Sequence, residues 1–514
     1  MKQVLGITYS LLITFFCTAQ EEDIKAAKTP ISEIPDCSKK EELIQTKHRV
    51  TIGGKQIEYL AVAGNYILKD EKCNPTGSIF FVSYTKENPD PSEDRPITFC
   101  FNGGPGSSSV WLHLGLLGPK RVQLNENGKA SPPYRFIENE FSLLDETDLV
   151  FIDPISTGYS RAILPYETKQ FHGYTEDIKS VAEFIRIYLT QNKRWDSPKF
   201  IAGESYGTTR AAGLAAHLLD EHYIYVNGLI LISTILNFQC VDFEDGNDLP
   251  YLLFLPTYTA SAWYHKKLSP ELQENFLSTI QAAREFVIDD YARALFKGAL
   301  LTPLEKQQVL ENLSKFTGLS VEYIDRCNLR VASDRFRKEL LRNQEETLGR
   351  FDSRFKGVDV DAAGECPEYD PSAAAIFGAF TATMNQYLLT DLEYKKESEY
   401  KILTNVFPWD YGNKKCYFNV SDTLRSVMTK NGNLRVFVAN GYYDLATPFF
   451  ETEYTFNHLG LRPQFQNHVT MKYYDGGHMM YIEEPILKQM KEDLTNYYRK
   501  TRIDQTSARF HLSR

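Results

Sequence analysis

Short apolar segments alternate with amphipathic segments through the first half of the chain. Residues 97–102, 148–153 and 226–232 are strongly apolar, which is typical of strands buried on both faces of a sheet. Residues 176–191 carry apolar side chains at helical spacing, and a second helix is predicted over 208–222. Strands and helices that alternate in this way predict a mostly parallel, doubly wound α/β sheet.

The N-terminal part of the chain shows the strand period of two. Residues 48–69 alternate around Gly53-Gly54 and again around Gly64-Asn65, which predicts two hairpins. A further strand is predicted over 78–84.

Helical patterns dominate between residues 240 and 431. Thr302-Pro303-Leu304-Glu305 is a capping box with proline at the first helical position, and Ser269-Pro270 opens a helix in a similar way. A helix rich in small residues is predicted over 372–389. A structureless loop of this length is implausible within a compact domain, so we interpret the region as an inserted helical cap.

The alternating pattern returns near the C-terminus, with strands predicted over 434–439 and 468–474 and a closing helix over 485–499. The whole pattern predicts one α/β domain that the cap interrupts. The expected divisions are a signal peptide at 1–19, a flexible N-terminal arm at 20–45, the first part of the α/β domain at 46–239, the helical cap at 240–431, the second part of the domain at 432–502 and a C-terminal tail at 503–514.

Residues 1–19 have the features of a signal peptide. Lys2 supplies the positive charge, residues 4–16 the apolar core, and Cys17-Thr18-Ala19 a small-residue cleavage site. We therefore expect export to the periplasm or the extracellular space, with no membrane span in the mature chain. The alternatives are a retained N-terminal anchor, for which the apolar core is short, and a lipid-modified Cys17.

Composition narrows the classes of partner and cofactor. The 514 residues carry a formal net charge of −10 and no long basic run, which argues against nucleic acid and anionic membranes as partners. Of the eight cysteines, seven would remain after removal of the leader. A disulfide from Cys240 to Cys327 or Cys366 would link parts of the cap, although pairing cannot be derived from the sequence. No C-x-x-C motif or Cys/His cluster is present, so neither a metal nor another cofactor is expected.

One predicted strand ends in a Gly-x-Ser-x-Gly motif. The apolar residues 200–202 lead into Gly203-Glu204-Ser205-Tyr206-Gly207, and a helix follows at once. This order of strand, sharp turn and helix is typical of a nucleophile elbow, in which two glycines let the strand and the helix approach closely. By itself the motif also fits an ordinary turn, so Ser205 becomes a candidate nucleophile only with suitable partners.

A serine nucleophile needs a base and a carboxylate that orients the base. In a hydrolase sheet both follow later strands, the acid before the histidine. Of the ten histidines only His478 directly follows a C-terminal strand, and Asp444 lies in the loop after the preceding strand. Asp475 competes with Asp444, but it lies three residues before His478 in a glycine turn, where aspartate commonly makes a local hydrogen bond. We therefore predict a triad of Ser205, Asp444 and His478.

The acyl intermediate of such a triad needs hydrogen-bond donors for its oxyanion. One expected donor is the N–H of Tyr206, which follows the nucleophile. The other is expected from the glycine-rich loop at 103–109, which follows the strand at 97–102. A phosphate-binding role for this loop is disfavoured because it lacks Gly-Lys-Ser/Thr and an acidic partner for a metal ion.

Taken together, these segments resemble the serine carboxypeptidase family, the relatives of carboxypeptidase Y, and the resemblance implies an α/β-hydrolase fold. The matching segments follow the family's order and span most of residues 97–482. They are Asn102-Gly103-Gly104-Pro105-Gly106-Ser107-Ser108-Ser109, Leu117-Gly118-Pro119, residues 148–154 and 158–160, Gly203-Glu204-Ser205-Tyr206-Gly207, Asn440-Gly441-Tyr442-Tyr443-Asp444 and Gly477-His478-Met479-Met480-Tyr481.

The resemblance implies an exopeptidase that removes C-terminal amino acids, with peptides that have a free C-terminal carboxylate as substrates, and the leader-like residues 1–19 suggest that it is secreted. It implies a catalytic triad of Ser205, Asp444 and His478, oxyanion donors on Gly104 and Tyr206, and substrate-carboxylate binding by Asn102, Gly103 and Glu204. Glu204 can meet a substrate carboxylate only if the two acids share a proton, which favours acidic pH.

Three positions depart from the family pattern when the loop is aligned without gaps. Cys100 stands where the family has a tryptophan, Ser107 where it has a cysteine, and Leu116 where it has a second glutamate of the carboxylate site. With one acid in place of two, an acidic pH optimum does not follow directly. The loop and Trp111-Leu112-His113 are similar to the bacterial branch of the family.

Two other functions compete with a carboxypeptidase. The same triad would serve an esterase or an acyltransferase, an alternative that Leu116 strengthens and that Asn102 beside Glu204 weakens. A non-catalytic binding protein on a hydrolase scaffold is expected to lack a triad member, and none is missing here.

Overall fold

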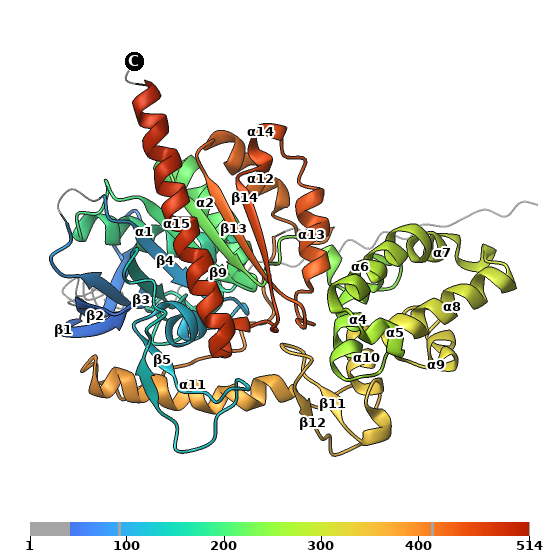
Figure 1. Cartoon of the computed structure of the whole chain (residues 1–514). Helices are drawn as coiled ribbons and strands as arrows, with labels where there is room; N and C mark the ends of the chain where they lie inside the picture. Colours follow the sequence, from blue (N-terminus) through green and yellow to red (C-terminus); the bar gives the residue numbers. More distant parts are fainter. Residues whose placement is uncertain (1–41, 91–93, 413–415, 513–514) are drawn as a thin grey trace, which may run out of the picture. The chain divides into compact units, whose positions relative to one another are not determined.

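The computed structural model describes residues 42–90, 94–412 and 416–512 (Figure 1). By its internal contacts the chain divides into two units, residues 1–39 and 40–514, and all described residues belong to the second. The signal peptide expected at 1–19 and most of the arm expected at 20–45 lie outside the described residues. The end of that arm is not irregular, because strand β1 already begins at Leu43.

One large sheet organises the described residues. Its strands lie in the order β1-β2-β3-β7-β4-β9-β10-β13-β14, and the short β8 also pairs with β3. Pairing is antiparallel from β1 to β7 and parallel from β7 to β14, so the predicted mostly parallel sheet is confirmed. The bounds are β1 (Leu43–Ile52), β2 (Lys55–Lys69), β3 (Pro75–Lys86), β4 (Ile97–Phe101), β7 (Asp148–Ile152), β8 (Arg161–Ala162), β9 (Lys199–Glu204), β10 (Gly228–Ile232), β13 (Arg435–Gly441) and β14 (Val469–Tyr474).

Helices cover both faces of the sheet (Figure 1). Successive residues of a strand point to opposite faces, so in β9 Phe200 and Ala202 belong to one buried cluster and Ile201 to the other. Because both faces of the sheet are buried from solvent, the central strands are apolar throughout. The first face is covered by α11 (Pro371–Thr390) and α15 (Glu484–Leu512), and the second by α1 (Tyr174–Gln191), α2 (Tyr206–His222) and α12 (Ser421–Lys430).

The hairpin predicted at Gly53-Gly54 is confirmed, but the one predicted at Gly64-Asn65 is wrong. Strand β2 runs straight through Gly64 and pairs with β1 and β3 on its two sides. A Cβ on Gly64 would lie 2.1 Å from the carbonyl oxygen of Glu42. The glycine is required because the incoming chain crosses it closely, and not because the chain turns there.

Helices α3 to α10 form the cap and have a hydrophobic core of their own. The predicted capping box is confirmed, since Thr302 Oγ1 accepts a hydrogen bond from the Glu305 N–H at 3.3 Å. The core of the cap includes Tyr443 and Leu445, so the cap packs directly on the loop after β13. The bounds are α3 (Leu249–Leu253), α4 (Leu255–Tyr264), α5 (Pro270–Gln273), α6 (Phe276–Phe286), α7 (Ala292–Lys297), α8 (Pro303–Thr317), α9 (Val321–Arg326) and α10 (Ser333–Glu339).

The extent predicted for the cap, residues 240–431, is too long. The chain leaves the cap after α10 through β11 (Thr347–Leu348) and β12 (Lys356–Gly357). Beyond them α11 packs on the sheet through Phe380, and α12 packs beside α2 through Leu424. Helical periodicity identifies these segments as helices, but it does not reveal which surface their apolar faces contact.

The segment expected to be a C-terminal tail, residues 503–514, is helical as far as Leu512, where α15 ends. Neither glycine nor proline follows Pro485, so nothing in the sequence stops the helix at the predicted boundary. None of the described helices is both long enough and apolar enough to cross a membrane. The described residues also form β5 (Lys120–Val122), β6 (Phe136–Glu138), α13 (Phe449–Asn457) and α14 (Pro463–Gln466).

The disulfide considered for the cap is wrong. Cys240, Cys327 and Cys366 form no disulfide within the described residues. Cys240 is fully buried, and its Sγ lies 3.8 Å from the hydroxyl of Thr455 on α13. The thiol therefore packs between the cap and the α/β domain, where it behaves as a small apolar side chain.

Candidate active site

Ser205 lies at the turn between β9 and α2. Its backbone has a φ of 59° and a ψ of −132°, which a non-glycine residue seldom adopts and which marks a strained nucleophile elbow. A Cβ on Gly203 would lie 2.2 Å from the carbonyl oxygen of Gly207, and one on Gly207 would lie 3.0 Å from that of Phe101. The two glycines of the motif are therefore required by close packing, and they present Ser205 at the carboxyl end of β9.

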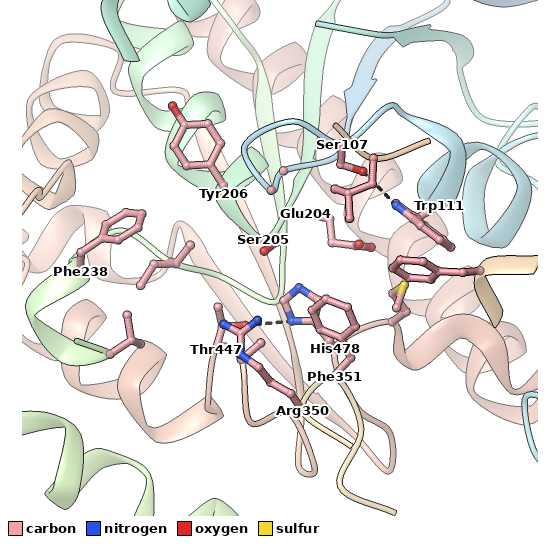
Figure 2. Close-up of a pocket in the computed structure, with 18 residues that line it drawn as sticks. Ser107, Trp111, Glu204, Ser205, Tyr206, Phe238, Arg350, Phe351, Thr447 and His478 are labelled. Carbon is pink, nitrogen blue, oxygen red and sulfur yellow. Dashed lines mark hydrogen bonds between the residues drawn. The ribbon is translucent and has the colours of Figure 1, made fainter. Parts of the chain in front are cut away.

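His478 and Asp444 come from the loops that follow β14 and β13. His478 Nδ1 lies 2.7 Å from Asp444 Oδ2, and both residues are buried. The side chain of Asp475, the competing acid, is exposed. Ser205 and His478 thus line one pocket, as Figure 2 shows, and Asp444 contacts His478.

Asp444 is fixed by hydrogen bonds within its own loop. Its Oδ1 accepts from the N–H groups of Ala446 at 2.8 Å and Thr447 at 3.0 Å, and the Thr447 hydroxyl donates to its Oδ2 at 2.8 Å. With His478 as the fourth donor, the carboxylate has no free acceptor position. Asp444 can therefore orient the imidazole without moving.

A segment that returns from the cap covers His478. The ring of Phe351 stacks on the imidazole at a centroid distance of 5.1 Å, and its carbonyl oxygen accepts from the His478 N–H. Burial disfavours the charged imidazole, but the carboxylates of Asp444 and Glu204 more than offset it, so the pKa of His478 is raised. A histidine of this kind is suited to accept a proton from Ser205 and to stabilise the resulting charge.

The glycine-rich loop after β4 lies against the Ser205 turn. A Cβ on Gly103 would lie 2.5 Å from the nitrogen of Tyr206, so only glycine allows this approach. Gly104 has a φ of +102°, which glycine adopts without strain. Gly104 and Tyr206 both line the pocket beside Ser205, where donors for an oxyanion are expected.

Arg210 on α2 holds this loop in place, although nothing in the sequence analysis identifies it. Its guanidinium is buried, donates to Asp177 at 2.7 Å and donates to the carbonyl oxygen of Asn102 at 2.5 Å. It also lies over the rings of Phe101 and Tyr206, at 5.1 and 5.2 Å from their centroids. Arg210 thus links both sides of the expected oxyanion hole.

Glu204 is a buried acid directly before Ser205, the candidate nucleophile. It accepts hydrogen bonds from the amide of Asn102 at 2.9 Å and from the hydroxyl of Tyr481 at 2.5 Å. Asn102 Oδ1 in turn accepts from the N–H of Leu112 at 3.1 Å, which fixes its amide. Burial raises the pKa of Glu204 to about 7, even though His478 and both hydrogen bonds favour its ionised form. Near neutral pH this carboxyl is therefore protonated in a large fraction of molecules.

A pocket of about 180 Å³ opens over Ser205 (Figure 2). Most of its wall is apolar, and a few polar groups converge near Ser205, as in typical small-molecule sites. In the described part of the chain, no cluster of three or more His, Cys, Asp or Glu side chains could hold a metal ion. The lining residues include Gly103, Gly104, Ser107, Trp111, Glu204, Ser205, Tyr206, Phe238, Arg350, Phe351, Phe377, Ala446, Thr447, His478 and Met479.

The three departures from the family pattern occupy different environments. Cys100 is buried in β4, and Leu116 is buried in the core on one face of the sheet. Ser107 lines the pocket, and its Oγ accepts a hydrogen bond from Trp111 Nε1 at 2.9 Å. The position where a second acid was expected therefore faces the core and not the pocket.

Other pocket residues were missed by the sequence analysis. Tyr481 lies in a segment that carries the family resemblance, three residues after His478, so it could have been included. Arg350 and Phe351 have no comparable local signal. They reach the pocket only because the chain folds back from the cap.

A strained serine turn after a central parallel strand, with an acid and a histidine after later strands, defines an α/β hydrolase. The solved structure of a prohormone-processing carboxypeptidase, Kex1, from Saccharomyces cerevisiae shares this fold, with a TM-score of 0.55 at 17% identity over 86% of this chain and 91% of that one. A model of the serine carboxypeptidase family matches residues 62–492. The chain therefore belongs to the serine carboxypeptidase family.

Curated relatives match over shorter segments. Serine carboxypeptidase-like 36 of Arabidopsis thaliana is 28% identical over 188 residues, which is 35% of this chain and 36% of the relative. Carboxypeptidase Y homolog A of Paracoccidioides brasiliensis (strain Pb03) is 27% identical over 29% of this chain and 25% of its own length. The chain thus spans about a quarter to a third of these curated relatives.

Proposed function

We propose that the protein is a serine carboxypeptidase that releases C-terminal amino acids from peptides through an acyl-enzyme on Ser205. The observation that carries the proposal is the buried pair of Asn102 and Glu204, of which Glu204 directly precedes Ser205 and lines the pocket. An esterase has no need of a protonatable acid at this place. A substrate carboxylate can accept hydrogen bonds from the Asn102 amide and from protonated Glu204, which fixes the chain end one residue beyond Ser205.

The remaining groups supply the steps of hydrolysis. His478 takes the proton of Ser205 as its oxygen attacks the scissile carbonyl, while Asp444 holds the imidazole and stabilises its charge. The N–H groups of Gly104 and Tyr206 stabilise the oxyanion. His478 then gives the proton to the leaving amine, and water hydrolyses the acyl-enzyme by the same steps in reverse.

Export to the periplasm or the extracellular space is part of the proposal and is supported by the leader-like pattern of residues 1–19. N-terminal sequencing of the protein secreted by its host tests it. We expect a mature chain that begins at or near Gln20, whereas a chain that keeps Met1 would contradict export by cleavage.

Digestion of one peptide in two forms, with a free C-terminal carboxylate and with a C-terminal amide, tests the activity. We expect mass spectrometry to show stepwise trimming of the free form only, and no trimming by Ser205→Ala. A fluorophosphonate probe should label the parent protein but not Ser205→Ala. Equal cleavage of both forms, or hydrolysis of simple esters without any trimming, would replace the proposal by an esterase or acyltransferase.

A further inference from the structure

Arg350 places a guanidinium without a partner among the described residues in the pocket that Ser205 lines. The residue follows β11 where the chain returns from the cap, and its exposed side chain lines the same pocket as Ser205 and His478 (Figure 2). Its backbone is fixed, because its N–H donates to Asp370 Oδ1 at 3.0 Å and its carbonyl oxygen accepts from the Leu445 N–H at 3.0 Å. The charged end therefore projects from a firmly held position.

The acids whose charges act on Arg350, which are Asp444, Asp370 and Asp334, already have partners. Asp444 accepts from four donors, and Asp370 accepts from backbone N–H groups and from the Ser372 hydroxyl. Among the described residues, none forms a hydrogen bond or an ion pair with the guanidinium, which only lies 5.8 Å from the ring centroid of Phe351. Its neighbours differ in this respect, since Arg337 pairs with Asp334 and Arg354 with Asp352, both at 2.6 Å.

The position of Arg350 relative to the nucleophile indicates which part of a substrate it meets. In Figure 2, Glu204 and Trp111 lie to the right of Ser205, while Thr447 and Arg350 lie below it, next to His478. If Glu204 holds the C-terminal carboxylate, the residue to be released lies on the Glu204 side. The residue that contributes the scissile carbonyl then lies away from Glu204, in the same pocket that Arg350 lines.

We propose that Arg350 binds the side-chain carboxylate of the penultimate residue, so that the enzyme favours peptides with Asp or Glu at that position. The inference rests on the proposed acyl transfer at Ser205 and adds to it a specificity for the penultimate side chain of the peptide. An arginine suits this role because its planar, permanently charged fork donates two parallel hydrogen bonds to a carboxylate. The ring of Phe351 lies beside the guanidinium, and the rest of the pocket wall is mostly apolar, which strengthens such a pair.

The test compares two N-blocked dipeptides, N-acyl-Glu-Phe and N-acyl-Gln-Phe. They differ only in whether the penultimate side chain ends in a carboxylate or in a neutral amide. We expect the parent enzyme to show a higher kcat/KM for the Glu peptide. Arg350→Gln should lower the Glu-to-Gln ratio of kcat/KM by about tenfold to a hundredfold, the range for a hydrogen-bonded charge. Arg350→Glu should reverse the charge preference, so that N-acyl-Lys-Phe is cleaved with a higher kcat/KM than N-acyl-Glu-Phe. Arg326→Gln removes the same charge from an exposed site on α9 and should leave the ratio unchanged.

The Glu-to-Gln ratio of kcat/KM separates substrate binding by Arg350 from its other effects on the site. Its charge also lowers the pKa of His478, but that effect is common to both peptides and cancels. An unchanged ratio in Arg350→Gln would overturn the inference while trimming of peptides continued. An equal loss on both peptides would also overturn it, because it would place the C-terminal carboxylate on Arg350. If peptides are not trimmed at all, the α-methyl esters of N-acyl-Glu and N-acyl-Gln give the same ratio, so the proposed function and the specificity fail separately.

Discussion

The Tyr481 hydroxyl donates a hydrogen bond to Glu204 Oε2 at 2.5 Å, across 277 positions of the sequence. Tyr481 lies just after the His478 loop, and Glu204 is the last residue of β9, directly before Ser205. The contact therefore connects the element that carries the candidate base with the element that carries the candidate carboxylate receptor. The hydrogen bond also lowers the pKa of Glu204, because it favours the ionised form and so opposes the effect of burial.

Tyr481→Phe removes this donor and should shift the pH dependence of peptide trimming. Without the hydrogen bond, the ionised form of Glu204 loses stabilisation, so the pKa of Glu204 rises above its present value of about 7. Protonated Glu204 then persists to higher pH. We expect the alkaline limb of kcat/KM for a free-carboxyl peptide to move upward by roughly one pH unit. An alkaline limb that stays in place would show that Glu204 does not set it.

Glu204→Gln should remove the alkaline limb altogether. Glutamine has nearly the shape of the protonated acid and cannot ionise, so it does not repel a substrate carboxylate above pH 7. We expect the variant to exceed the parent enzyme in kcat/KM at pH 8 or 9 and to fall below it near pH 5, where the parent carboxyl is protonated. Simple ester substrates without a carboxylate serve as the control and should show no such crossover. Equal losses at every pH would contradict the proposed proton sharing.

Asp444→Asn should leave the fold intact and abolish most of the activity. Two backbone N–H groups point at Oδ1, so the asparagine oxygen must take that position and its NH₂ must face His478 Nδ1. The imidazole then accepts at Nδ1 and carries its proton on Nε2, where it cannot take the proton of Ser205. We expect kcat to fall by roughly 10⁴-fold, with an unchanged urea midpoint. Asp475→Asn is the matched control and should retain activity.

Much of the fold follows from local pattern, and the failures have one cause. The apolar strands, the helices at 176–191 and 208–222, and the capping box at Thr302 depend on residues that are close in sequence, so periodicity identifies them. The strand through Gly64, the docking of α11 on the sheet and the buried Cys240 depend on what packs against each segment. Sequence period does not carry that information.

The candidate site divides in the same way. Ser205 and His478 could be singled out because each lies at a fixed place after a strand, with glycines that permit sharp turns. Arg210 could not, because its partners Asp177 and Asn102 come from α1 and from the loop after β4. The sequence pattern does not distinguish this buried arginine from an exposed polar residue of α2.

Arg210 leads to a prediction about stability. Its side chain is 1% exposed and that of Asp177 is 3% exposed, so they form a buried ion pair. Arg210→Met would leave the Asp177 carboxylate without its partner in a site where burial already raises its pKa. We expect the free energy of unfolding, from urea titration, to fall by about 3–5 kcal/mol. Activity should fall as well, because the Asn102 carbonyl loses a donor and the expected oxyanion hole loses its support.

The double variant Arg210→Met with Asp177→Leu separates loss of the pair from loss of packing. Apolar residues of similar volume avoid the unpaired charge, so the double variant should recover most of the stability that the single variant loses. Its activity should stay low, since the Asn102 carbonyl still lacks its donor. A double variant that is as unstable as Arg210→Met would mean that the shape of the guanidinium between Phe101 and Tyr206, and not its charge, stabilises this part of the molecule.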